Sequence, residues 1–415
     1  MSPELISILV LVVVFVIATT RSINMGVLSF AAAFGVGELV ADLDSDGIFA
    51  GFPGDLFVVL VGVTYLFAIA RANGTTDWVV HAAIRLVRGR ISLIPWVMFA
   101  ITATLTGIGA LSPAAVAIVA PIALSFAARY AISPLLMGAM VVHGAQGGGF
   151  SPISIYGTIV NGIVDREGLP GSELGLFFAS LVVNVLIAGV VFVLLGGLKL
   201  GGAAPVDDAR DREAATLDPA RAATLASLVA LVLAVLVFEL DAGLTAITLA
   251  VLLNVAWPTV GRRAVGEIAW PTVLLICGVL TYVGVLEAMG TIEYAGNAVG
   301  DIGVPLLAAV LICYIGAIVS AFASSVGIMG ALIPLAVPFL LQGEIGAAGM
   351  IAALAVSATV VDVSPFSTNG ALVLAAAPDV DRDRFFRQLM VYGGVIVAAV
   401  PPVVWLAFVV VPGLG

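Results

Sequence analysis

Charged residues are scarce in this chain, and histidine and cysteine are nearly absent. Asp, Glu, Lys and Arg together make up 10% of the 415 residues, whereas 62% of the residues are hydrophobic. A soluble domain needs more charged surface than this, so the composition excludes a soluble protein and indicates a polytopic membrane protein. The two cysteines, Cys277 and Cys313, lie inside apolar segments, far from any paired-cysteine or metal-ligand spacing. We therefore predict two buried, inert thiols.

Basic residues are also few. The chain has 16 Lys and Arg against 26 Asp and Glu, and its net charge of -10 argues against a nucleic-acid partner. There is no HExxH run and no pair of acids placed for catalysis inside the membrane, so we expect neither an enzyme nor an organic cofactor. The apolar stretch 5–20 follows no basic n-region and precedes no small-residue cleavage site, which is typical of a retained membrane helix.

What the chain does contain is two groups of apolar runs long enough to cross a membrane as helices. The first group lies at 4–20, 23–41, 55–72, 134–164 and 173–197. The second group follows a polar linker at 201–219 and lies at 220–240, 243–260, 270–289, 345–377 and 387–412. A longer charge-free stretch, at 91–128 and 302–343, separates the third and fourth runs of each group. We predict an all-α protein with two repeats, 1–200 and 220–415, each with five transmembrane helices and one re-entrant hairpin.

One short segment that contains Ser, Pro and Gly interrupts the fourth run of each group. The two segments read SPISIYG at 151–157 and SPFSTNG at 364–370, and each follows a proline 30 residues earlier, Pro121 or Pro334. A shift of 213 pairs these residues and also pairs Ser112 with Ser325, which indicates an internal duplication. We predict broken helices at 134–164 and 345–377. Interrupted hydrophobic segments in matching halves indicate the substrate site of a secondary transporter.

The placement of basic residues predicts the orientation. If each half has five spans, the halves are inverted, and 15 of the 16 basic residues lie on one face, with Arg166 alone on the other. Cytoplasmic loops carry the excess of Lys and Arg, so this face is cytoplasmic and both termini lie outside. We expect a multi-pass protein of the inner (plasma) membrane.

Helix breaks at membrane depth are tolerated only inside protein or beside a cavity, so polar groups near them are candidate ligands. Helix N-termini suit a carboxylate, whereas carbonyl and hydroxyl oxygens suit a hard cation such as sodium. The candidate substrate-binding residues are Ser112, Ser151, Ser154, Tyr156, Ser325, Ser364, Ser367, Thr368 and Asn369. None of them is cationic, so an anionic substrate would need a bound cation. The alternative is that these serines only bond the backbone or aid packing.

Two ionisable residues, Asp362 and His143, lie near the breaks, where charged groups are expensive and usually functional. Asp362 is expected to ligate sodium, accept a proton or anchor the broken backbone. His143 is either a packing histidine or a proton-sensitive site residue. The candidate sodium ligands are Gly107, Ser112, Gly148, Ser324, Thr359 and Asp362.

The segment 49–99, continuing through GALSPAAVAIVAPIAL and MVVHGAQGGGFSPISIYG, resembles the MatC family of dicarboxylate carriers. Members of that family are associated with malonate and related C3 and C4 diacids, and the resemblance is densest over residues 1 to about 165. More distantly, the chain is similar to the divalent anion/sodium symporters of the ion transporter superfamily. That resemblance implies two opposed hairpins, two unwound helices, an elevator mechanism and a homodimer.

The hairpin tips depart from the pattern of those symporters, which carry Ser-Asn-Thr ten residues before a proline. The corresponding residues here are Leu111, Ser112 and Pro113 in the first half and Ser324, Ser325 and Val326 in the second. Hydroxyl groups persist at the tips, but the amide is missing, and Asn369 supplies an amide instead. The substrate contacts of those symporters therefore cannot simply be transferred.

Taken together, these features predict a sodium-coupled importer of small dicarboxylates in the lipid bilayer. The alternatives are an inorganic-ion transporter, or a proton-coupled or exchange carrier of the same superfamily.

Overall fold

The computed structural model describes residues 2–21, 23–76, 78–79, 82, 90–201, 217–238, 240–291, 294, 305–321, 325–341, 343, 345–377 and 380–413. Within these ranges the chain forms helices and connecting turns without a β-strand. Five of the described helices are long and apolar enough to cross a membrane, and several shorter apolar helices accompany them. The fold is therefore that of a polytopic membrane protein, as the composition predicts.

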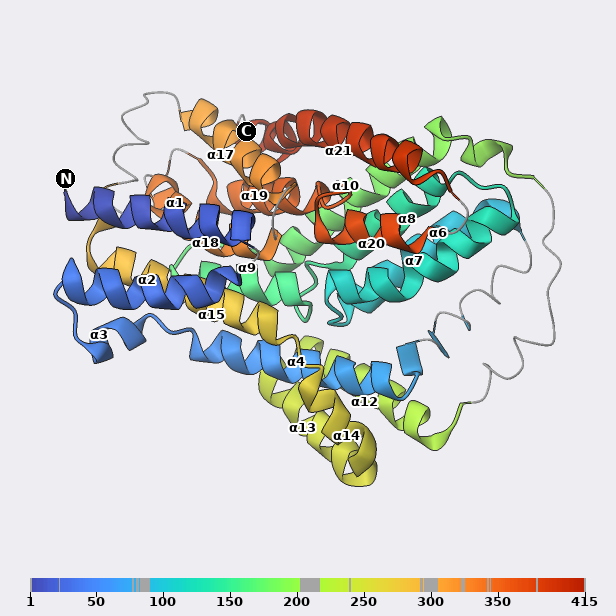
Figure 1. Ribbon diagram of the computed structural model, residues 1–415, viewed down its shortest axis with the longest axis horizontal. Coiled ribbons are helices and arrows are strands. Elements are labelled where there is room, and N and C mark those ends of the chain that lie inside the picture. The colour runs from blue at the N-terminus through green and yellow to red at the C-terminus, as the bar shows by residue number, and fades with distance from the viewer. Residues whose placement is uncertain are drawn as a thin grey trace.

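The helices of the first half are numbered in chain order (Figure 1). They are α1 (Pro3–Arg21), α2 (Met25–Leu39), α3 (Ser45–Ala50), α4 (Gly54–Ala72), η1 (Ile91–Leu93), α6 (Ile94–Gly107), α7 (Ser112–Arg129), α8 (Pro134–Gly148), α9 (Ile155–Arg166), α10 (Glu173–Leu194) and η2 (Gly197–Lys199). Side chains of Ser133, Ser154 and Ser172 cap α8, α9 and α10 by accepting hydrogen bonds from backbone N–H groups of the first turn.

The second half contains a similar series. Its helices are α12 (Pro219–Leu236), α13 (Ala242–Ala256), α14 (Pro258–Gly266), α15 (Trp270–Ala288), α17 (Pro305–Ser320), α18 (Ser325–Leu341), α19 (Ala347–Val360), α20 (Thr368–Ala376), α21 (Arg382–Trp405), the π-helix η3 (Leu406–Val410) and α22 (Val411–Gly413). Proline lies in the first turn of α12, α14 and α15, where its missing N–H has no intrahelical partner to lose.

The fourth apolar run of each half is interrupted. In the first half α8 ends at Gly148 and α9 begins at Ile155, and in the second α19 ends at Val360 and α20 begins at Thr368. The N–H of Gly157 donates to the carbonyl of Gly149 at 3.2 Å, and the N–H of Gly370 donates to the carbonyl of Asp362 at 3.1 Å. The two breaks therefore contain equivalent backbone hydrogen bonds, because the shift of 213 residues places Gly149 on Asp362 and Gly157 on Gly370.

The charge-free stretches form paired helices. In the first half α6 and α7 pack together and are joined by residues 108–111. In the second half α17 and α18 pack together, and residues 322–324 between them, including the predicted sodium ligand Ser324, lie outside the described ranges. Most of the predicted linker 201–219 also lies outside these ranges.

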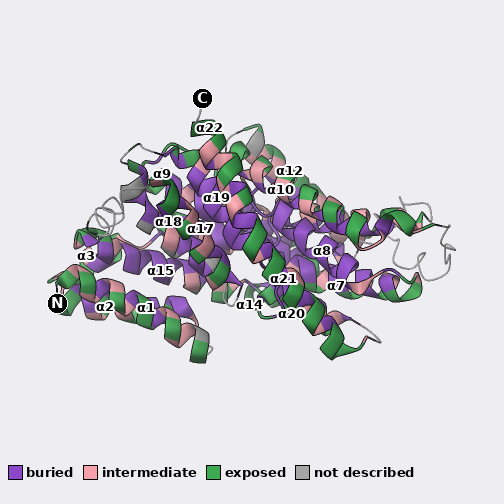
Figure 2. Cartoon of the chain, turned by 90° about the horizontal axis from the view of Figure 1, so that it is seen from above, coloured by how far each residue is buried: buried purple, intermediate pink, exposed green. Residues whose placement is uncertain are grey.

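The centre of the molecule is formed by α8 and α19. Residues 135–148 of α8 and 350–360 of α19 are buried, and both helices are buried at the centre of Figure 2. α8 packs against α6, α7 and α10. A Cβ atom on Gly148 would overlap the backbone carbonyl of Ala103 in α6, so this close approach requires glycine. The interrupted helices are therefore held in the core of the protein.

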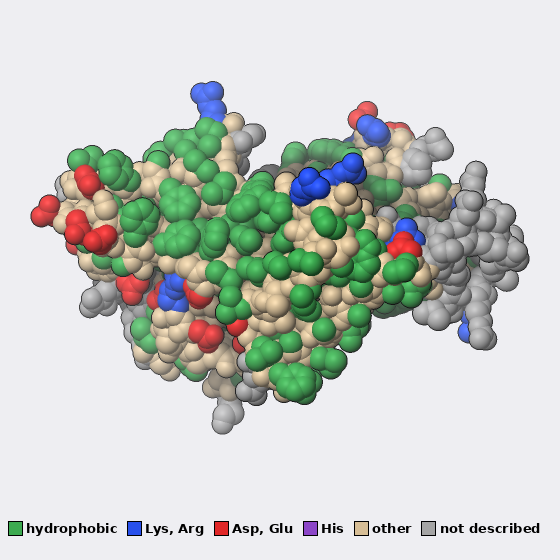
Figure 3. Space-filling view, turned by 90° about the horizontal axis from the view of Figure 1, so that it is seen from below, with side chains coloured by type: hydrophobic (Ala, Val, Ile, Leu, Met, Phe, Trp, Pro, Cys, Tyr) green, Lys and Arg blue, Asp and Glu red, His purple; other side chains and the backbone are tan. Residues whose placement is uncertain are grey.

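The periphery is apolar in the way that a lipid-facing surface must be. Large hydrophobic side chains are exposed on α1, α10, α13 and α21, including Val12, Leu186, Leu252 and Val391. Figure 3 shows hydrophobic side chains spread over one face, with acidic side chains gathered mainly toward one end. This surface supports a multi-pass membrane protein.

Both ends of α4 carry ion pairs. Arg71 in the last turn pairs with Glu267 at 3.0 Å, and Asp55 in the first turn pairs with Arg166 at 3.2 Å. Arg71 and Arg166 therefore lie at opposite ends of this helix.

Candidate functional site

The buried carboxylate of Asp362 is the centre of a polar site in the interruption between α19 and α20. Its Oδ1 accepts a hydrogen bond from the backbone N–H of Asn369 at 3.3 Å, so it faces the first turn of α20. Its Oδ2 accepts from the Asn369 side-chain amide at 2.8 Å and from the Gln146 amide at 3.0 Å. The positive end of a helix and two amide groups thus stabilise this carboxylate.

The hydroxyl of Ser112, the first residue of α7, completes this site. Its Oγ accepts from Asn369 Nδ2 at 2.7 Å and lies 3.4 Å from Gln146 Nε2. Ser112, Gln146, Asp362 and Asn369, here called the carboxylate–amide cluster, are each at most 4% exposed. The start of α7, the end of α8 and the second break therefore meet, although the residues come from both halves of the chain.

The cluster contains no basic side chain. Ion pairs in the described ranges join Arg71 to Glu267, Arg166 to Asp55 and Arg221 to Asp218, so none of these involves Asp362. The described residues also contain no group of three or more His, Cys, Asp or Glu side chains that could hold a metal ion. The oxygens that face one another across the cluster are those of the Asp362 carboxylate and the Ser112 hydroxyl, a type of ligand that hard cations prefer, whereas the two amides direct their nitrogens to them.

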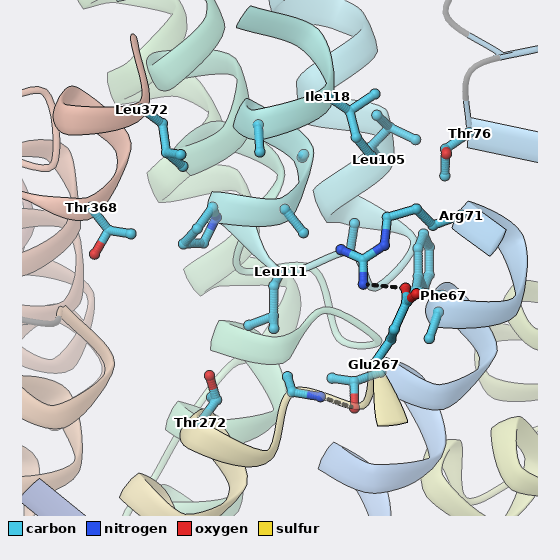
Figure 4. A pocket seen from close by; sticks show the side chains of 18 of the residues that line it. Phe67, Arg71, Thr76, Leu105, Leu111, Ile118, Glu267, Thr272, Thr368 and Leu372 are labelled. Atoms are coloured by element: carbon cyan, nitrogen blue, oxygen red, sulfur yellow. Dashed lines mark hydrogen bonds and ion pairs between the residues drawn. The ribbon is translucent and has the colours of Figure 1, made fainter. Parts of the chain in front are cut away.

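A cavity of about 530 Å³ lies beside the cluster. Asp362, Tyr156, Ser325 and Thr368 contribute to its wall, and the rest of the wall is mostly apolar. In Figure 4, Thr368 and Leu372 lie on one side of the cavity and the Arg71–Glu267 ion pair lies on the other. Both members of that pair are about half exposed, and Thr368 is exposed as well, so the cavity is open to the surroundings of the molecule.

The serines of the two breaks are engaged with backbone. Ser154 donates to the carbonyl of Ser151 at 2.7 Å and accepts from the N–H of Gly157, and Ser367 likewise donates to the carbonyl of Ser364 at 2.7 Å and accepts from the N–H of Gly370. Ser151 donates to the carbonyl of Gly107. Ser364 accepts from the N–H of Phe366 at 3.3 Å. These are the backbone-bonding roles that the sequence left open as an alternative for the serines.

The other predicted site residues lie in four different settings. Thr359 donates to the carbonyl of Ala355 within its own helix, and Gly148 packs against α6. Ser325 lines the cavity and lies 2.7 Å from the hydroxyl of Ser320. His143 is fully buried, with Nδ1 2.8 Å from Asn184 Oδ1 and Nε2 2.6 Å from the hydroxyl of Tyr392. None of these side chains has a recorded hydrogen bond with the carboxylate–amide cluster.

Three residues of the site were not selected from the sequence. Gln146 belongs to the cluster, and Arg71 and Glu267 form the ion pair on the cavity wall. The signal for Gln146 was its position, a lone amide in an apolar helix just before a run of three glycines. Charged side chains are common at helix ends, where Arg71 and Glu267 lie. Nothing in the sequence therefore marked these two residues as part of a site.

Comparisons with known proteins give one family match and one similar fold. Residues 1–149 match the family model described as "Dicarboxylate carrier protein MatC N-terminus", which confirms the predicted resemblance over that part of the chain. No curated protein sequence matches the chain.

Among solved structures, the fold is similar to that of the YdaH transporter of Alcanivorax borkumensis, described as having an unusual topology. The TM-score is 0.56 at 16% identity, over 88% of this chain and 89% of that one, so the likeness concerns the fold. The matched dicarboxylate carrier family and the shared fold indicate that the protein is a transporter and not an enzyme.

Proposed function

We propose that the protein is a sodium-coupled importer of small dicarboxylates. The observation that carries this proposal is the buried carboxylate–amide cluster beside an open cavity of about 530 Å³. The match of residues 1–149 to a dicarboxylate carrier family supports the proposed substrate class.

The cavity suits a small diacid in size and in polarity. Its volume lies within the range of about 300–1,000 Å³ that is common for small-molecule sites. The first turns of α7 and α20 begin at Ser112 and Thr368, beside the cavity, and helix N-termini favour negative charge. A carboxylate of the substrate would take backbone N–H groups there, as the carboxylate of Asp362 takes the N–H of Asn369.

Coupling to a cation follows from the charge of the site. A dianion entering the cavity meets Asp362, whose negative charge is buried and has no ion pair among those of the described ranges. Two carboxylates close together in a low-dielectric region repel each other strongly. A cation bound with the substrate would remove this repulsion, and we propose that sodium is this cation.

The proposed transport cycle is alternating access of the elevator type. In this proposal the two halves are inverted repeats, the paired helices α6–α7 and α17–α18 are re-entrant hairpins, and the protein is a homodimer. The equivalent backbone hydrogen bonds in the two breaks support the proposal that the halves are repeats. The paired helices and broken helices would move together, while α1, α2, α4 and α12 to α15 would form the scaffold.

Uptake into proteoliposomes tests this proposal. Purified protein should import radiolabelled malonate or succinate when sodium is present outside, and replacing sodium with choline at fixed pH should abolish import. The variant S112A should lose most of this uptake, because the Asn369 amide would lose its hydroxyl partner. Variant S172A, which alters the exposed cap of α10, should transport normally. Uptake that continues at the same rate in choline would contradict sodium coupling, and absence of diacid uptake would contradict the substrate class.

A further inference from the structure

A positive charge lies on the cavity wall, away from the carboxylate–amide cluster. Thr64, Phe67, Ala68 and Arg71 of α4 all line the cavity, and their spacing places them on one face of that helix. Phe67 and Ala68 make most of this face apolar. Among the described residues that line the cavity, Arg71 is the one basic side chain. An anion in the cavity therefore finds its nearest cationic group at the end of α4.

The guanidinium of Arg71 has donors that the protein does not use. It donates one recorded hydrogen bond in the described part of the chain, to Glu267 at 3.0 Å, whereas a guanidinium has five N–H groups. The side chains of Arg71 and Glu267 are 43% and 46% exposed. An ion pair as exposed as this contributes little to stability. Another carboxylate can therefore take the place of Glu267 at low cost.

The hydroxyl of Thr76 is a second unused donor on the same wall. Thr76 lines the cavity and is only 4% exposed, and its Oγ1 is buried without a hydrogen-bond partner in the described part of the chain. By contrast, the hydroxyl of Thr64 donates to the carbonyl of Leu60 at 2.7 Å. A buried polar atom without a partner is unfavourable and uncommon in native proteins. A carboxylate oxygen in the cavity would supply the missing acceptor.

These donors and the helix N-termini lie at different ends of the cavity. In Figure 4, Arg71 and Thr76 lie on the side opposite Thr368, the first residue of α20, and Leu111 and Ile118 line the wall between them. A cavity with polar groups at two ends and an apolar wall between them matches a molecule with two carboxylates joined by methylene groups. A monocarboxylate can satisfy only one of the two ends.

We propose that Arg71 and Thr76 form a second anion subsite, which binds the distal carboxylate of a diacid whose other carboxylate lies at the first turns of α7 and α20. The guanidinium donates two parallel hydrogen bonds to this carboxylate, and the Thr76 hydroxyl donates a third. The subsite therefore selects diacids over monoacids of the same length. This inference rests on the proposed substrate class, which it deepens by assigning the second carboxylate.

Glu267 gives the subsite a way to release its ligand. Without a diacid, Glu267 pairs with Arg71, and the arriving carboxylate displaces it into water. In the proposed cycle α4 belongs to the scaffold and α20 moves, so the contact with Arg71 must break before the substrate can cross. Renewed pairing of Glu267 with Arg71 compensates for the broken contact. Variant E267Q removes this competitor, so it should bind the diacid several-fold more tightly and turn over more slowly.

Diacid binding to purified full-length protein tests the subsite. Titration calorimetry in sodium chloride first identifies the tightest ligand among malonate, succinate, glutarate and adipate. That diacid is then compared with its monomethyl ester, which has the same skeleton and one negative charge. Variant T76V should lower the preference for the diacid by about threefold, since a neutral hydroxyl contributes less than a guanidinium. Variant R166Q breaks the ion pair at the other end of α4 and should keep the preference.

The role of Arg71 is measured between E267Q and the double variant R71Q/E267Q. Replacing Arg71 alone would leave the charge of Glu267 on the cavity wall, where it would repel any dianion. The two chosen variants lack that charge and differ only at residue 71. The preference for the diacid over its monomethyl ester should be about tenfold lower in the double variant. If the double variant does not fold, T76V and E267Q still decide the proposal.

The outcomes separate the subsite from the proposed function. An equal preference in E267Q and R71Q/E267Q would overturn the subsite, even if the natural protein imports diacids with sodium. Unchanged affinity in both T76V and E267Q would also overturn it. A preference that depends on Arg71, in a protein that binds diacids but does not import them, would support the subsite and contradict the import function. A natural protein that binds none of the four diacids would contradict both.

Discussion

At the residue scale, the buried His143 is a structural partner of the carboxylate–amide cluster. Its ring lies between Asn184 of α10 and Tyr392 of α21. The Asn184 amide donates to the carbonyl of Ser180, and the Ser180 hydroxyl donates to the carbonyl of Gln146. This series of hydrogen bonds reaches the backbone of a cluster residue, so His143 helps to fix the position of α8 relative to α10 and α21.

Variant Y392F should therefore destabilise the protein. It leaves Nε2 of the buried His143 without its partner, and an unsatisfied buried polar atom costs about 1–3 kcal/mol. Thermal unfolding in detergent, supported by denaturant titration, measures the change. Sodium-driven uptake should fall less than it does in S112A, because the cluster side chains themselves are intact.

Variant Y314F is the matched control for this prediction. The Tyr314 hydroxyl also makes one hydrogen bond, to the carbonyl of Ala398 at 2.9 Å, but at an exposed position. Removing the Tyr314 hydroxyl leaves no buried ring nitrogen without a partner, so the loss should be smaller than in Y392F. Equal losses in Y392F and Y314F would show that the His143 contact is not worth more than a surface hydrogen bond.

The sequence identified part of the candidate site for a clear physical reason. Ser112, Asp362 and Asn369 were selected because polar groups in apolar segments require partners. Gln146 was not selected, because only the fold brings the end of α8 to the second break. Conversely, Ser154 was selected as a ligand, but its oxygen caps α9, and a sequence does not show which partner a buried hydroxyl takes.

At the element scale, a glycine three residues after the capping serine shapes each break. Gly157 and Gly370 lie in the first turns of α9 and α20. A Cβ atom at Gly157 would overlap the carbonyl oxygen of Ser151, and one at Gly370 would overlap the carbonyl oxygen of Ser364. Backbone therefore occupies the space where a side chain would begin, and the turn cannot keep its shape with alanine.

Variants G157A and G370A should each lose about 1–3 kcal/mol of stability, the usual penalty for overpacking. Both should also lose most diacid uptake, because the start of each half-helix would shift. Thermal unfolding and proteoliposome uptake measure the two effects.

The control is G189A, in α10, where a Cβ atom would meet nothing within 4 Å. That variant should be neutral or gain up to about 1 kcal/mol from helix propensity. Normal uptake in G157A would contradict the role assigned to the break.

Hydropathy located most apolar helices but not the places where they stop. The predicted run 55–72 corresponds closely to α4, Gly54–Ala72. The predicted run 243–260 instead ends at Ala256, because Pro258 begins the separate helix α14. A proline has no backbone N–H and cannot continue the hydrogen bonds of a preceding helix. Hydropathy measures only how apolar a segment is, so it does not predict this end. Short helices such as α3 were missed for a related reason, since six residues are too few for a hydrophobic period.

At the scale of the whole molecule, the cavity connects the cluster to the side that carries Arg71. If that side is cytoplasmic, as the placement of basic residues predicts, the cavity of this conformation opens to the cytoplasm. The native Cys277 and Cys313 are both at most 2% exposed, so single introduced cysteines can report on access without interference. Candidate positions are Asp165 for the outside, Lys199 for the cytoplasm and Thr368 for the cavity.

A membrane-impermeant thiol reagent then measures which side each cysteine faces. D165C should react in intact cells, whereas K199C should react only in inside-out vesicles. T368C should react in inside-out vesicles as well, because Thr368 is exposed and lines the cavity. Sodium and a diacid together should slow the reaction of T368C, since the substrate is proposed to occupy the cavity beside it, while K199C provides the control for general access. Reaction of K199C in intact cells would reverse the orientation, and reaction of T368C from the outside alone would place the cavity opening on the opposite face from Lys199.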